Sequence, residues 1–144
     1  MSKPLIKKIL FICTGNSCRS QMAEGWVRKL KGDVLEPYSA GIEKHGIDPK
    51  AVKVMSEVGV DISKQQSKLI SELGEKDFGY VVTICNDANE KCPVFLGKAK
   101  RLHHGFDNPP ILSRKTKSEE ESLAIYRRVR DEIKQYVSEM PANL

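Results

Sequence analysis

The segment from Cys13 to Ser20 holds the residue types of this sequence that are best suited to chemistry. It reads Cys-Thr-Gly-Asn-Ser-Cys-Arg-Ser and lies between an apolar run and a stretch of helical periodicity. Backbone N–H groups at the start of a helix are unpaired, and the helix dipole favours anions there. The guanidinium of Arg19 can grip two oxygens of one tetrahedral oxyanion as a fork. The segment therefore predicts an oxyanion site.

The same segment predicts a nucleophile. A positive environment stabilises the thiolate of a cysteine, which is the nucleophilic form, and Ser20 can donate its hydroxyl to the Cys13 sulfur. Gly15 is expected to adopt a backbone angle that other residues avoid. We predict that Cys13, Arg19 and Ser20 are catalytic. The oxyanion is expected to contact the loop itself, which comprises Thr14, Gly15, Asn16, Ser17, Cys18 and Arg19.

A cysteine at the end of a strand is more often a small buried hydrophobic residue than a nucleophile. For Cys13 the functional interpretation is favoured, because the glycine, the arginine and the strand–helix context coincide. Cys18 has no base or resolving partner in the sequence around it, and we interpret its thiol as packed within the loop.

Two further cysteines, Cys85 and Cys92, have six residues between them and follow another apolar run. If that run is a strand of a parallel sheet, Cys85 lies at the same sheet edge as Cys13. Several neighbouring thiols can deliver two electrons by thiol–disulfide exchange. The alternatives are unrelated thiols, or a zinc site completed by His103 and His104. Zinc sites usually use closer cysteine pairs, and adjacent histidines on a strand point opposite ways, so no metal is expected.

The elements that must position these residues follow from alternating apolar patterns. A continuous apolar run predicts a strand buried on both faces over residues 7–12, and a further apolar strand is predicted over 78–84. Strands are also predicted over 34–39 and 99–103. Helical spacing predicts helices over 22–30, over 49–58 with Asp48 as N-cap, and over 119–140 with Ser118 as N-cap. A short helix is expected over 66–73, and 108–117 is the one loop long enough to be mobile. Strands separated by helices favour a parallel sheet covered on both faces.

Length and composition restrict the classes of protein to be considered. The 144 residues suit one domain over 1–144, large enough to bury a core without disulfides or a metal. The net charge of +5 is spread along the chain, so no nucleic-acid partner is expected. The longest apolar stretch, Ile9–Cys13, is too short to cross a bilayer, and the N-terminus lacks the apolar region of a signal peptide. We expect a cytoplasmic monomer without a membrane partner.

Several segments of the chain resemble one known group of enzymes. The loop continues as Gln-Met-Ala-Glu-Gly-Trp over 21–26, and further similarity lies in 38–43, 45–46, 57–63 and 127–133. These segments resemble the low-molecular-weight protein tyrosine phosphatase superfamily, and more closely the thioredoxin-coupled arsenate reductases built on that fold. The similarity covers nearly the whole chain, and these reductases have two extra cysteines at positions that match Cys85 and Cys92. The resemblance and the strand–helix order imply an α/β, flavodoxin-like three-layer sandwich, with four parallel strands and helices on both faces.

The resemblance implies a three-thiol reduction of arsenate to arsenite. Cys13 would attack the arsenic, Cys85 would attack the Cys13 sulfur and release arsenite, and Cys92 would then form a disulfide with Cys85. Thioredoxin would reduce that disulfide, so an external reductant and no bound cofactor are expected. Phosphate and sulfate would act as substrate analogues. Two alternatives stay open: a protein tyrosine phosphatase, and a non-catalytic oxyanion-binding or redox-sensing module. If the protein is a reductase, a residual phosphatase activity is possible.

The position of the general acid departs from the pattern of that group. The leaving oxygen needs an acid, which in the group is an aspartate immediately before a proline, whereas here Asn108 precedes Pro109. We predict that Asp107 takes this role and that Asn108 contacts the substrate. The alternative is that Asn108 only orients the substrate and that Asp107 is a solvated loop charge.

A cation site of some relatives is also altered. The oxygen ligands of their monovalent cation would map to Asn16, Glu24 and Ser39. The fourth position, acidic in those relatives, is Lys68 here, and its ammonium can replace the cation by reaching Glu24. We therefore predict that potassium does not change the activity.

Overall fold

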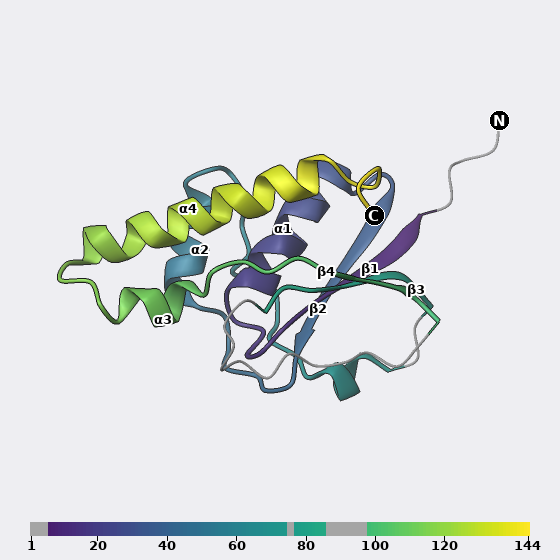
Figure 1. The fold of residues 1–144 in the computed structure, drawn as a ribbon, viewed down its shortest axis with the longest axis horizontal. Coiled ribbons are helices and arrows are strands. Elements are labelled where there is room, and N and C mark those ends of the chain that lie inside the picture. Colours follow the sequence, from purple (N-terminus) through teal and green to yellow (C-terminus); the bar gives the residue numbers. More distant parts are fainter. Residues whose placement is uncertain (1–5, 75–76, 86–97) are drawn as a thin grey trace.

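A four-stranded parallel sheet forms the centre of the fold (Figure 1). The computed structural model describes residues 6–74, 77–85 and 98–144. The strands are β1 (Lys7–Cys13), β2 (Leu35–Gly41), β3 (Phe78–Thr83) and β4 (Lys100–His103). Their order is β2-β1-β3-β4, and every neighbouring pair is parallel. The predicted α/β class and four-stranded parallel sheet are confirmed, and each strand begins and ends within two residues of its predicted range.

β1 is an inner strand of the sheet and carries Cys13 at its end. Its residues Ile9–Cys13 are all buried, as expected for a parallel strand covered on both faces. The side chains alternate between two hydrophobic clusters: Phe11 packs in one, whereas Leu10 and Ile12 pack in the other. The sheet therefore separates two cores, and the chain leaves it at Cys13 between β2 and β3.

The long helices lie together on one face of the sheet. α1 (Arg19–Lys31), α2 (Pro49–Ser56) and α4 (Glu119–Ser138) pack there, with the short α3 (Pro109–Ser113) against α4 (Figure 1). Trp26 of α1 donates its indole N–H to the carbonyl oxygen of Arg130 in α4, at 3.1 Å. On the other face the described chain has the 3-10 helix η1 (Ile70–Leu73), whose Leu73 packs in the second cluster. The predicted layering, with helical cover on both faces, is thus confirmed.

Two helices begin where the sequence predicts. The carboxylate of Asp48 accepts a hydrogen bond from the backbone N–H of Lys50 at 2.9 Å, and Pro49 takes the first helical position. The hydroxyl of Ser118 accepts a hydrogen bond from the backbone N–H of Glu121 at 3.1 Å. Each cap satisfies a backbone donor that the first turn of a helix leaves unpaired.

Two local predictions need correction. The helix expected over 66–73 is limited to Ile70–Leu73 and is of the 3-10 type, because the preceding backbone pairs with β2: Gly41 donates its N–H to the carbonyl oxygen of Lys68 at 2.9 Å. The stretch 108–117, predicted to be a loop long enough to be mobile, contains α3. Pro109 favours the start of this helix because its ring fixes the dihedral angle φ at the first helical position.

Candidate active site

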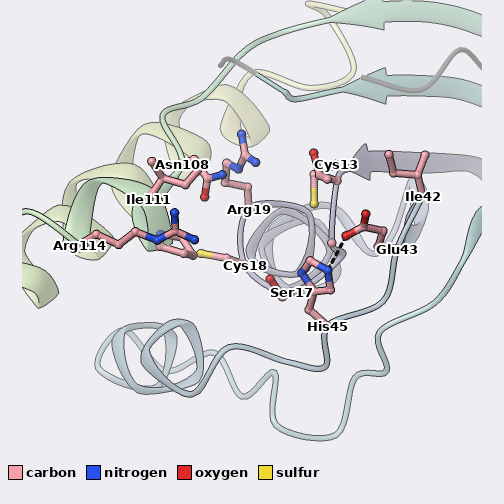
Figure 2. Close-up of a pocket in the computed structure, with 13 residues that line it drawn as sticks. Cys13, Ser17, Cys18, Arg19, Ile42, Glu43, His45, Asn108, Ile111 and Arg114 are labelled. Carbon is pink, nitrogen blue, oxygen red and sulfur yellow. Dashed lines mark hydrogen bonds and ion pairs between the residues drawn. The ribbon is translucent and has the colours of Figure 1, made fainter. Parts of the chain in front are cut away.

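A pocket of about 370 Å³ lies at the loop between β1 and α1. Its walls come from this loop, from the segment after β2 and from α3 with its flanking residues (Figure 2). The lining residues are Cys13, Thr14, Gly15, Ser17, Cys18, Arg19, Ile42, Glu43, His45, Asn108, Pro110, Ile111 and Arg114. The pocket therefore brings together the predicted nucleophile, most of the predicted anion loop and Asn108.

The backbone of the loop is arranged to bind an anion. Its carbonyl oxygens accept hydrogen bonds from the segment after β2: Glu43 N–H binds Thr14 O at 3.0 Å, His45 N–H binds Gly15 O at 3.1 Å, and Asp48 N–H binds Ser17 O at 2.9 Å. In a trans peptide the C=O and the N–H point in opposite directions. Because these carbonyl oxygens point outward to the segment after β2, the N–H groups of the same peptides point into the loop. Between described residues, the N–H groups of 15–18 donate no hydrogen bond. The loop thus offers a concave set of donors to a tetrahedral oxyanion.

Asn16 carries the unusual backbone angle of the loop. Its φ of 48° is the one positive value among the non-glycine residues that the structure describes. Its buried amide donates to Ser20 Oγ at 2.9 Å and accepts from the backbone N–H of Lys68 at 2.7 Å, which holds the strained conformation in place. The prediction that Gly15 adopts such an angle was wrong. A Cβ at Gly15 would meet Nδ1 of His45, so a larger residue there would displace the imidazole.

Cys13 and Ser20 make the contact that the sequence predicts. The Cys13 sulfur lies 2.8 Å from the Ser20 hydroxyl oxygen, and both side chains are buried. The Ser20 oxygen also accepts from the Asn16 amide. When Cys13 is a thiolate it has no hydrogen to donate, so the Ser20 hydroxyl is then the donor. A hydroxyl that donates to sulfur stabilises the thiolate relative to the thiol, so this contact favours the nucleophilic form.

Arg19 connects the loop to the neighbouring strand ends. Its guanidinium is buried, and one nitrogen donates to the carbonyl oxygens of Ile84 at 3.3 Å and Phe106 at 3.1 Å. Arg19 also lines the pocket. The side chain is therefore tied to the segments that follow β3 and β4, and its forked grip on an oxyanion stays a prediction.

Cys18 lies immediately before α1 and is almost inaccessible to solvent. Burial raises the pKa of its thiol well above the usual value, and the carboxylate of Asp48 acts in the same direction. Cys18 is therefore a neutral thiol that packs within the loop while also lining the pocket.

The structure separates the two residues considered for the acid position. Asn108 lines the pocket. The carboxylate of Asp107 instead faces α4, where it pairs with the guanidinium of Arg128 at 3.0 Å, and Asp107 does not line the pocket. The backbone at Asn108 is extended, so neighbouring side chains point to opposite sides. The predicted acid is thus not brought to Cys13 in this structure.

Cys85 lies at the sheet edge where the loop begins. Ile84 donates its N–H to the carbonyl oxygen of Ile12 at 3.0 Å, so the chain after β3 stays beside β1 as far as Cys85. The Cys85 thiol is buried and forms no disulfide. Cys13 and Cys85 therefore leave neighbouring strands at the same edge, which is the placement that the sequence predicts. Cys92 lies outside the described residues.

The residues of the altered cation site lie together. Glu24 is buried, and one of its carboxylate oxygens accepts from the Ser39 hydroxyl at 2.8 Å and lies 4.0 Å from the Lys68 ammonium. The other carboxylate oxygen accepts from Arg28 at 2.8 Å. The Asn16 amide oxygen is bound by the backbone N–H of Lys68. Protein donors thus face the oxygens that the resemblance assigns to a cation.

The sequence reasoning missed the pocket wall that follows β2. Glu43 and His45 both line the pocket, and Nε2 of His45 lies 2.6 Å from Oε2 of Glu43 (Figure 2). The available signal was a Glu-x-His sequence soon after a predicted strand, at the edge where parallel sheets form their sites. Arg114 enters from the end of α3 and had no comparable signal, because that helix was not predicted.

The described residues contain no group of three or more histidine, cysteine, aspartate or glutamate side chains that could hold a metal ion. Within the same ranges, no helix is both long and apolar enough to cross a membrane.

Known proteins are similar to this chain over most of its sequence. Residues 8–144 match the family model described as low molecular weight phosphotyrosine protein phosphatase. An arsenate reductase of Bacillus subtilis is 54% identical over 127 residues, which cover 88% of this chain and 89% of that protein.

Solved structures show the same fold. An arsenate reductase in its phosphate-binding state has a TM-score of 0.76 at 31% identity. The match covers 96% of this chain and 98% of that reductase. A thioredoxin-dependent arsenate reductase of Corynebacterium glutamicum has a TM-score of 0.60 at 25% identity, over 95% of this chain and 64% of that one. By sequence and by fold, this chain belongs to the low molecular weight phosphotyrosine protein phosphatase family.

Proposed function

We propose that this protein is an arsenate reductase that converts arsenate to arsenite with thioredoxin as its reductant. The similar proteins named above are arsenate reductases, and one of them is thioredoxin-dependent. The observation that carries the proposal is the position of Cys85, a buried thiol at the sheet edge where the Cys13 loop begins. A phosphatase needs only the Cys13 thiolate, whereas a two-electron reduction by thiols needs a second one.

In the first step, the loop amides and Arg19 hold arsenate while the Cys13 thiolate attacks the arsenic. A sulfur–arsenic bond forms and one arsenic–oxygen bond breaks. The thiolate, HAsO₄²⁻ and one proton give Cys13–S–AsO₃²⁻ and water, and arsenic stays in oxidation state V. The donors for the remaining oxygens are the loop residues Thr14, Gly15, Asn16, Ser17 and Cys18. Ser20 stabilises the thiolate before it attacks.

The next steps move two electrons from thiols to arsenic. The Cys85 thiolate attacks the Cys13 sulfur, the sulfur–arsenic bond breaks, and its electron pair leaves on arsenic as arsenite, As(III). Protons from solvent complete As(OH)₃, and a Cys13–Cys85 disulfide forms. Cys92 then attacks the Cys85 sulfur and frees Cys13, and thioredoxin reduces the resulting Cys85–Cys92 disulfide.

The pocket walls favour a small oxyanion over phosphotyrosine. Asn108 and Ile111 lie across the pocket from Cys13 (Figure 2). Pro110 also lines the pocket, and the described lining contains no phenylalanine, tyrosine or tryptophan ring. Stacking on the phenyl ring of a phosphotyrosine would need such a side chain. Phosphatase activity is therefore expected only as a weak residual activity of the Cys13 loop.

The redox state of the cysteines bears on the cellular compartment in which the protein acts. Cys13, Cys18 and Cys85 form no disulfide among the described residues. A thiol relay needs cysteines that start reduced, which is the condition of the cytoplasm. We place the protein there as a single domain over residues 1–144 and as a monomer, where reduction of arsenate serves arsenic detoxification.

Steady-state formation of arsenite, with thioredoxin kept reduced, tests this function. The wild-type protein should turn over. Cys85→Ser should lose turnover but still bind phosphate, because the loop that holds the oxyanion is unchanged. Cys92→Ser should stop after one turnover with Cys13 bonded to Cys85. Full turnover by either variant would contradict the relay, and a wild type that forms no arsenite would contradict the function.

A further inference from the structure

The leaving oxygen of the proposed reaction faces the mouth of the pocket. In an in-line displacement it lies opposite the attacking sulfur, and Cys13, only 3% exposed, lies at the base of the pocket. Hydroxide is a poor leaving group, so a proton has to reach this oxygen as the bond to arsenic breaks. A side chain at the rim is therefore placed to supply this proton.

Most polar side chains near the rim cannot supply that proton. Asn108 has an amide, which is not an acid, and Arg19 and Arg114 hold their protons too tightly. Asp107 is turned away and pairs with Arg128.

Glu43 and His45 are the remaining acid–base side chains that the described lining presents at the rim. Histidine is the side chain that exchanges protons near neutral pH, whereas a solvated glutamate is ionised there. The imidazole of His45 is 56% exposed and the carboxylate of Glu43 59%, so both belong to the mouth rather than the base. His45 is thus the side chain suited to donate a proton.

The fold holds the imidazole of His45 against the anion loop. Its backbone N–H binds Gly15 O at 3.1 Å, and Nδ1 lies beside Gly15, in the space that a Cβ of that residue would enter. Nε2 lies 2.6 Å from Oε2 of Glu43 (Figure 2). A carboxylate that accepts from Nε2 fixes the orientation of the ring and leaves Nδ1 on the side of the loop.

We propose that His45, oriented by Glu43, donates the proton that converts the leaving oxygen of arsenate to water. The proposal rests on the function proposed above. As the Cys13 sulfur–arsenic bond forms and the arsenic–oxygen bond breaks, the proton moves from Nδ1 to the leaving oxygen. Water departs, and neutral His45 regains its proton from solvent, to which the ring is exposed. Glu43 touches no reacting atom and is a positioning residue.

A double-mutant cycle between positions 45 and 108 tests this role. The readout is kcat/KM for arsenate, because it includes the first chemical step. His45→Gln removes the proton and keeps a polar side chain, and its expected loss is about 100-fold or more, the usual contribution of a general acid. Asn108→Asp places a carboxylic acid at the rim, and the activity of this variant is the reference for the second half of the cycle. In that background His45→Gln should cost less than about ten-fold, because two donors then serve the same oxygen.

The outcomes of the cycle are distinct. An equal loss from His45→Gln in both backgrounds would show that His45 only supports the loop and would overturn the proposal, as would wild-type activity of His45→Gln. His45→Ala should regain activity with added imidazole, and no gain would also count against proton donation. His103→Gln removes a histidine on β4, outside the pocket, and should match the wild type. A wild type that forms no arsenite would instead contradict the reductase function itself.

Discussion

The sulfur of Cys13 and the hydroxyl oxygen of Ser20 lie 2.8 Å apart at the junction of β1 and α1. The amide of Asn16 donates to the same oxygen at 2.9 Å. These two contacts connect Asn16, Ser20 and Cys13 in one buried hydrogen-bond network that includes the Cys13 sulfur. The reactivity of Cys13 should therefore depend on a hydroxyl group that acts on sulfur rather than on the substrate.

Ser20→Ala should make Cys13 less reactive. Hydrogen bonds to charged groups contribute about 1.5–3 kcal/mol, so loss of the Ser20 hydroxyl should slow the reaction of the Cys13 sulfur by roughly ten- to a hundred-fold. The rate of Cys13 alkylation by iodoacetamide at neutral pH, with the modified peptide identified by mass spectrometry, measures this change. Ser122→Ala is the matched control, because Ser122 is a buried serine that binds Lys50 away from the loop. An unchanged alkylation rate in Ser20→Ala would show that the hydroxyl has no such role.

Potassium should not stimulate arsenate turnover. Ser39 and Arg28 donate to the carboxylate of Glu24, and the Lys68 ammonium lies 4.0 Å from it, so the positive charge is already supplied by the chain. The measurement is kcat/KM for arsenate in potassium and in sodium salts of equal ionic strength. A clear increase in potassium alone would mean that a cation displaces the Lys68 side chain.

Asp107→Asn should leave kcat/KM for arsenate near the wild-type value, because the Asp107 carboxylate faces Arg128 rather than the pocket. The exposed ion pair that it removes contributes at most about 1 kcal/mol to the free energy of unfolding. Glu132→Gln removes the other carboxylate that pairs with Arg128 and is the matched control. A large loss in Asp107→Asn but not in Glu132→Gln would restore Asp107 as the general acid.

The stability of the fold should fall in acid partly through Glu57. Hydrogen bonds from Arg127 lower the pKa of Glu57 to about 2, and Arg130 acts in the same direction. Because this pKa is below the ordinary value of 4.5, the unfolded chain takes up the proton first. The contribution of ionised Glu57 to the free energy of unfolding is therefore complete above pH 4.5 and is lost as the pH falls toward about 2.

Urea unfolding between neutral and strongly acidic pH checks this contribution. Glu57→Gln should lose less free energy of unfolding than the wild type does as the pH falls from about 5 to about 2.5. Glu119→Gln, at an exposed glutamate at the start of α4, is the matched control and should follow the wild type. Identical pH dependence in all three proteins would show that the Glu57–Arg127 pair does not contribute.

The strands and the loop were predictable because local patterns determine them. A strand that is buried on both faces needs continuous apolar side chains, and the run that ends at Cys13 has them. The change to a polar segment before a helical pattern then places the loop at the sheet edge. Cys85 was expected beside Cys13 for a related reason, since parallel strands end at one edge.

Other features depend on partners far away in the sequence. The left-handed angle of Asn16 is held by the backbone of Lys68, and the direction of the Asp107 side chain depends on Arg128 in α4. The wall of Glu43 and His45 forms because their backbone N–H groups bind carbonyl oxygens of the loop. Spacing within one segment contains no information about such partners, so these features required the structure.

The most direct test of the thiol relay is a count of free thiols in the fully reduced protein before and after arsenate, without any external reductant. The sequence has four cysteines, and the relay predicts that two thiols per chain are lost, with one arsenite formed for each disulfide. Peptide mapping should find that disulfide between Cys85 and Cys92. Four free thiols after arsenate, or a disulfide that leaves out Cys85, would contradict the account.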